Sequence, residues 1–119
     1  MPEIAVLQMT TGVDPEANLA VIKDAAHTSA KRGATVLFTP EMALLLDRDR
    51  ARARRWVESH APAAMIDRLS EIAAKAQINI AIGSMPVAAG GGKWANRAHY
   101  FAPDHSPPVI YDKMHMFDV

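Results

Sequence analysis

Three short runs of apolar residues constrain the fold of this chain more than any other feature. They occupy residues 4–9, 34–38 and 78–84, and each has the length of a strand that is buried on both faces of a sheet. Segments with helical periodicity lie between them. With no internal repeat and no linker, this order predicts one α/β domain over residues 1–119.

Local signals place the helices. Asp14 is a favourable N-cap, Pro15 suits the first helical position, and Gly33 can adopt the left-handed conformation after the last turn. We therefore predict an amphipathic helix at about residues 15–32. A later helix is expected to begin at Pro62. The apolar residues of these two helices recur at helical spacing: Leu19, Ile22, Ala26 and Ala30 in the first, and Ile66, Leu69, Ile72, Ala73 and Ala76 in the second.

The remaining segments are shorter. Residues 42–60 contain five arginines and predict a short helix. Residues 88–93, with three consecutive glycines, are typical of a flexible turn. Residues 95–102 and 109–113 flank a loop rich in proline, which predicts a hairpin with a longer connection than the two-residue type.

Composition excludes several classes of protein. Thirteen basic and thirteen acidic side chains cancel, so no global charge attracts nucleic acid or an anionic membrane. The chain has no cysteine, which rules out disulfides and thiolate metal sites within it. No signal peptide or membrane span is recognisable. We therefore expect a soluble cytoplasmic protein.

Two charged residues are candidates for chemistry. Glu41 follows the predicted strand at 34–38, where α/β folds bind their ligands, although loop carboxylates are commonly just solvated. Lys113 lies at the end of the last predicted strand and could stabilise an oxyanion, or it could be a surface lysine that protects a sheet edge. Neither residue identifies a reaction alone.

Taken in order, the segments of this chain resemble the N-terminal half of the nitrilase, or carbon–nitrogen hydrolase, superfamily. The ω-amidases and the amidases of deaminated glutathione are the most similar branch. The resemblance implies half of an α-β-β-α four-layer sandwich, in which two sheets pack together with helices outside. The matching stretches are residues 5–9 with Asn18, 33–41, 80–84, 96–98, 103–104 and 111–118.

The resemblance implies roles for both candidates. The residue matching Glu41 is a general base, and the one matching Lys113 stabilises the tetrahedral intermediate. A cysteine nucleophile completes the triad in the family, and this chain lacks it. The implied activity is hydrolysis of small carboxylic amides without cofactor or metal. The 119 residues alone are then expected to be inactive and to associate with copies of themselves.

Other interpretations stay open beside this one. The chain could be a catalytically inactive half-domain that binds a partner or forms a subunit interface. The glycine-rich stretch ending at Lys93 suggests a phosphate loop, but Val87 occupies the position of its first glycine. His115 and Asp118 could share a metal, although a structural role is favoured. The arginines of the short helix alternate with acidic residues, which favours a solvated face over a nucleic-acid site.

Overall fold

The computed structural model describes the backbone of residues 3–118 and the side chains of residues 3–112. Its elements follow the predicted order of strands and helices. They are β1 (Glu3–Val6), α1 (Pro15–Lys31), β2 (Ala34–Phe38), α2 (Arg50–Val57), α3 (Ala61–Ala76), β3 (Asn79–Gly90), β4 (Lys93–Phe101) and β5 (Val109–Asp118).

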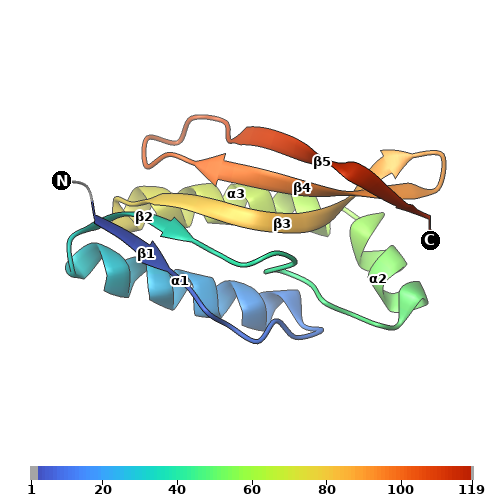
Figure 1. The fold of residues 1–119 in the computed structure, drawn as a ribbon, viewed down its shortest axis with the longest axis horizontal. Helices are drawn as coiled ribbons and strands as arrows, with labels where there is room; N and C mark the ends of the chain where they lie inside the picture. The colour runs from blue at the N-terminus through green and yellow to red at the C-terminus, as the bar shows by residue number, and fades with distance from the viewer. Residues whose placement is uncertain (1–2, 119) are drawn as a thin grey trace.

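The strands form one five-stranded sheet in the order β1-β2-β3-β4-β5 (Figure 1). The pairs β1–β2 and β2–β3 are parallel, whereas β3–β4 and β4–β5 are antiparallel. Crossovers between parallel strands are right-handed, so α1 and α3 lie side by side against the same face of the sheet. The core lies between them and the sheet. Its largest fully buried side chains include Ile22, Leu37, Leu69, Ile78, Ile80, Ile82 and Phe101.

The predicted helix signals are confirmed. The Asp14 carboxylate accepts a hydrogen bond from the backbone N–H of Glu16 at 3.0 Å, and α1 starts at Pro15. Gly33 follows the helix with a φ of 92°, a conformation that glycine adopts without a steric penalty. The α3 helix ends differently from a glycine cap, because Gln77 takes the left-handed conformation with a φ of 55°.

Strand lengths differ from the prediction. The first strand ends at Val6, although Leu7 N–H still donates to the Phe38 carbonyl at 2.8 Å. The flexible turn expected at 88–93 is wrong at both ends, since β3 continues to Gly90 and β4 starts at Lys93. Cross-strand pairing in this antiparallel ladder holds small residues that have little strand preference of their own. β5 likewise continues to Asp118, beyond the predicted strand end at residue 113.

An apolar row crosses the face of the sheet that α1 and α3 leave open. Strand register places one residue of each strand in this row, in the order Val6, Phe38, Ala81, Tyr100 and Val109. Val6 is 69% exposed and Val109 is 72% exposed. A sheet with one solvated face normally carries polar residues there. This sheet instead has two apolar faces, as expected of the inner layer of a sandwich.

One buried histidine predicts how stability depends on pH. His99 is buried against the ring of Phe101, with centroids 5.9 Å apart. Burial, with a smaller contribution from the Arg97 guanidinium, lowers the pKa of His99 below 6.5. The unfolded chain therefore binds more protons between the folded and unfolded pKa values. The contribution of neutral His99 to the free energy of unfolding should be fully present above pH 6.5. It should decrease as the pH falls from 6.5 toward the pKa of His99 in the folded chain.

Urea unfolding measured between about pH 7.5 and 5 tests this dependence. We expect His99→Phe to flatten the pH dependence. The exposed His60 supplies the matched control, and His60→Gln should leave it unchanged. An unaltered pH dependence in His99→Phe would show that another group is responsible.

Candidate active site

Glu41 lies in the turn that follows β2, at the carboxyl end of the parallel strands. This is the edge where the sequence places it, and where ligands bind in α/β sheets. Its side chain is exposed. The segment from Thr39 to Asp49 connects β2 to α2, and we call it the β2–α2 loop.

The start of the β2–α2 loop is bonded to β3. Thr39 N–H donates to the Ala81 carbonyl at 2.9 Å, and Ala43 N–H donates to the Ser84 carbonyl at 3.2 Å. Between them, Met42 N–H donates to Ser84 Oγ at 2.9 Å. Ser84 is fully buried, so its hydroxyl has one fixed place. Met42 and Ala43, the two residues that follow Glu41, are therefore held by the side chain and the backbone of the same serine.

Gly83 lets the loop approach this closely. A Cβ at position 83 would lie 2.6 Å from the Thr39 carbonyl oxygen and 2.7 Å from Pro40 C and O. These are backbone atoms that cannot rotate away. The Gly83 N–H also donates to Thr39 Oγ1 at 3.1 Å. Any side chain here must push the loop that carries Glu41 off the sheet.

We expect Gly83→Ala to lower the free energy of unfolding by roughly 1–3 kcal/mol, as overpacking does. Gly12→Ala is the matched control, because its nearest neighbour would be Asn18 Oδ1 at an ordinary 3.8 Å. Urea denaturation of both variants measures the difference. Equal stability of the two variants would contradict the steric argument.

Asn18 fixes the middle of the β2–α2 loop. Its side chain is 4% exposed, and its Nδ2 donates to the Leu44 carbonyl at 2.9 Å and to the Gly12 carbonyl at 3.0 Å. Gly12 N–H in turn donates to Asn18 Oδ1 at 3.0 Å. A further bond joins Leu46 N–H to the Gly12 carbonyl at 3.2 Å. The loops that follow β1 and β2 are thereby bonded to one another.

The end of the β2–α2 loop is held by an ion pair. Arg52 Nη2 donates to Asp47 Oδ1 at 2.8 Å, and the hydrogen bonds from this guanidinium lower the pKa of the Asp47 carboxyl to about 2. Only 1% of the Asp47 side chain is exposed. Asp49 caps α2 by accepting a hydrogen bond from Arg52 N–H at 3.0 Å. Contacts at its start, middle and end thus position the loop that carries Glu41.

The second predicted residue, Lys113, belongs to β5. Its side chain lies outside the described residues, as do those of His115 and Asp118. The β2 and β5 strands are separated in the sheet by β3 and β4. Asp112 precedes Lys113 in β5, and its side chain is described. It accepts a hydrogen bond from Arg97 Nε at 2.6 Å, which joins β5 to β4. This bond lowers the pKa of the Asp112 carboxyl.

Sequence reasoning gave no role to Ser84, Gly83 or Asn18. The only local signal was at Asn18, an amide on the apolar face of α1 next to Leu19 and one turn before Ile22. Among the described side chains, no group of three or more histidines, aspartates and glutamates is placed to hold a metal ion. The helices in the described part of the chain include none with the length and hydropathy of a membrane span.

The arginine-rich helix has the solvated face that its sequence pattern favours. Besides the Arg52–Asp47 pair, Arg54 lies 3.7 Å from the Glu58 carboxylate, and Arg50 and Arg55 are exposed, as is Arg48 in the preceding loop. The buried side of α2 is formed by Ala53 and Val57.

Comparisons with known proteins agree on one group. The model of the carbon-nitrogen hydrolase family matches residues 3–119. A relative, the deaminated glutathione amidase of Yersinia enterocolitica, is 30% identical over 118 residues, which cover 98% of this chain and 41% of that protein.

Solved structures give the same result. An amidase from Nesterenkonia sp. has a TM-score of 0.82 at 27% identity, covering 96% of this chain and 43% of that one. A variant of the Nesterenkonia sp. AN1 amidase in complex with butyramide has a TM-score of 0.81 at 26% identity, covering 98% of this chain and 44% of that one. In another variant of that amidase, acrylamide has added to the active-site cysteine. This structure has a TM-score of 0.82 at 26% identity, covering 97% of this chain and 45% of that one. The chain spans less than half the length of each relative, which confirms the predicted half of a sandwich.

Proposed function

This chain belongs to the carbon–nitrogen hydrolase family, and we therefore propose that it forms the N-terminal half of an amidase acting on small carboxylic amides. The observation that supports this most is the position of Glu41, which an extensively bonded loop holds at the carboxyl end of β2. A general base needs such a fixed position, because proton transfer requires hydrogen-bond geometry. We propose residues 1–119 as a single partial domain.

In the proposed reaction Glu41 removes the proton from a cysteine thiol that lies outside these residues. The thiolate attacks the amide carbonyl carbon, and the resulting oxyanion is stabilised by Lys113. The carbon–nitrogen bond breaks as the proton passes from Glu41 to the leaving nitrogen, which departs as ammonia. Water, deprotonated by Glu41, then hydrolyses the thioester, which releases the carboxylic acid and restores the thiol.

A second function is supported by a different observation. The apolar row on the open face suits contact with a partner layer, and this contact does not depend on catalysis. The chain also has no cysteine that could act as a nucleophile. A half-domain of this kind could serve as a binding or subunit-interface module.

A chimera distinguishes the two functions. Residues 1–119 replace the matching N-terminal part of the Nesterenkonia amidase, and ammonia release from butyramide is measured. The amidase proposal expects turnover by the chimera and none by the 119 residues alone. A folded chimera that binds butyramide without releasing ammonia would leave the binding module as the better description.

Self-association of the isolated chain is a further expected result. We expect the 119 residues to form dimers or larger species through the open face, because burial of exposed apolar surface drives association. Replacing Phe38 and Tyr100 with lysine should shift sedimentation to the monomer. The control is Val21→Lys on α1, a residue that is 44% exposed and lies outside the row. A wild-type chain that sediments as a monomer would contradict this.

A further inference from the structure

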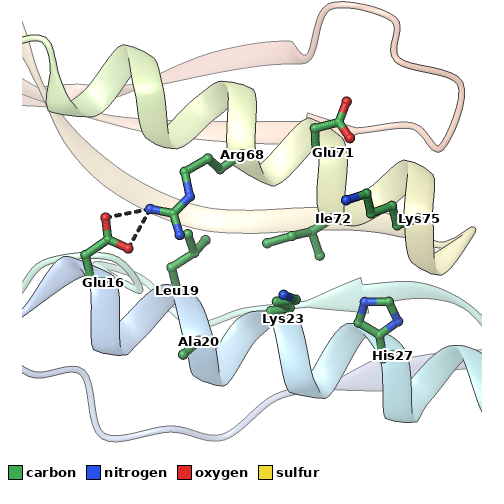
Figure 2. A pocket seen from close by; sticks show the side chains of 9 residues that line it. All are labelled: Glu16, Leu19, Ala20, Lys23, His27, Arg68, Glu71, Ile72 and Lys75. Atoms are coloured by element: carbon green, nitrogen blue, oxygen red, sulfur yellow. Dashed lines mark hydrogen bonds and ion pairs between the residues drawn. The ribbon is translucent and has the colours of Figure 1, made fainter.

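A groove lies between α1 and α3, and it shares no residue with the loop that carries Glu41. Its volume is about 400 Å³. Figure 2 shows its floor, formed by Leu19 and Ala20 of α1 and Ile72 of α3, with charged side chains along both sides. Leu19 and Ile72 are 2% and 7% exposed, so the floor is fixed by the core.

The carboxylates that line the groove are both engaged. Arg68 Nη1 donates to both carboxylate oxygens of Glu16 at one end (Figure 2). Glu71 is directed away from α1, and its carboxylate lies 3.5 Å from His105 Nδ1 in the loop between β4 and β5. Neither carboxylate lies within 4.0 Å of a basic side chain at the other end of the groove.

Toward that other end, three basic side chains line the two sides of the groove. Lys23 and His27 project from α1, one turn apart, and Lys75 lies opposite them on α3, with its side chain running along that helix near Ile72 (Figure 2). Among the described residues, none of the three has an acidic group within 4.0 Å. This contrasts with the arginines of α2, two of which have acidic partners. In a chain with no net charge, this is a local excess of positive charge beside an apolar floor.

We propose that this groove binds a small organic phosphate monoester. A phosphate dianion can accept hydrogen bonds from two lysines and an imidazole at once, and such charge-assisted bonds are the stronger kind. The apolar floor beyond Ile72 receives the organic group, whose burial adds to the affinity. A singly charged carboxylate satisfies fewer of the three donors, so a phosphate ester fits the groove better.

Titration of the 119-residue chain with propyl phosphate, followed by amide chemical shifts, tests the proposal. We expect saturable shifts at Ala20, Lys23, Ile72 and Lys75, with a Kd on the order of 1 mM. Inorganic phosphate and propionate, at matched ionic strength, should each bind at least several-fold more weakly. The midpoint of thermal unfolding should rise with propyl phosphate, because only the folded chain carries the groove.

Variants separate a built site from general charge attraction. Lys23→Gln combined with Lys75→Gln should weaken propyl phosphate at least about tenfold, at the usual value of exposed ion pairs. Lys31→Gln, in the last turn of α1 but outside the groove, should change the Kd less than twofold. Three results would overturn the proposal: shifts that do not saturate, equal shifts around Lys31, or inorganic phosphate binding as tightly as the ester.

Discussion

Replacing Asn18 with alanine should lower the free energy of unfolding by roughly 3 kcal/mol. The substitution removes three hydrogen bonds, each worth about 0.5–1.5 kcal/mol net. It also takes the side-chain partner from the Leu44 carbonyl and from the Gly12 N–H, and a buried polar group without a partner costs about 1–3 kcal/mol. The Gly12 carbonyl keeps its hydrogen bond from Leu46 N–H. The bonds at Gly12 are only partly buried, so water can replace them in part. The expected loss of stability is therefore smaller than the sum of these contributions. Urea denaturation measures the loss.

Asn79 provides a matched control. Its Nδ2 also donates to a backbone carbonyl, that of Thr35 at 2.9 Å, but the bond is exposed. Asn79→Ala should therefore cost only about 1 kcal/mol or less. An Asn18→Ala variant that loses no more stability than Asn79→Ala would show that Asn18 is not essential to the β2–α2 loop.

Replacing Glu41 with glutamine should lower the rate of amide hydrolysis by the chimera described above by about 10²–10⁴-fold, the usual contribution of a positioned general base. Glutamine has nearly the same shape but cannot accept the thiol proton. Because the Glu41 side chain is exposed, the fold should not change. The measurement is kcat/KM for butyramide, with the free energy of unfolding determined in parallel.

The other carboxylates and Lys113 make this test specific. Glu71→Gln, in the groove between α1 and α3, should leave kcat/KM unchanged. Lys113→Met should lower it by about 10²–10³-fold, as loss of an oxyanion donor does. If Glu41→Gln keeps more than about a tenth of the activity, Glu41 is not the general base, although the chain remains a family member.

The sequence predicted those parts of the fold that depend on local signals. Asp14, Pro15 and Gly33 placed α1 to within a residue, because capping requires only near neighbours in the chain. The extent of β3 and β4 was missed for the opposite reason. Ala88 has no strand signal, and only its pairing with Trp94 keeps it in the ladder.

The candidate site likewise has one feature that local sequence predicts and others that depend on distant contacts. The position of Glu41 follows from an apolar strand and a proline, which are adjacent in sequence. The hydrogen bonds that hold its loop could not be predicted in this way, because they join residues far apart in the chain. Met42 and Ser84 are 42 residues apart, and Thr39 and Gly83 are 44 residues apart. A serine and a glycine inside a strand pattern carry no sign of which distant backbone they will contact. The roles of Glu41 and Lys113 came from the family resemblance and remain proposals.

The strictly sequential order of the sheet has a kinetic consequence. Within residues 3–118, each strand after β1 pairs with the strand that precedes it in the chain, so none of these strands must wait for a later segment to be inserted beside it. The β3-β4-β5 meander closes only short loops, and such local contacts form faster than distant ones. During synthesis each strand can therefore add to an edge that already exists, while the helices cover the growing sheet from one side.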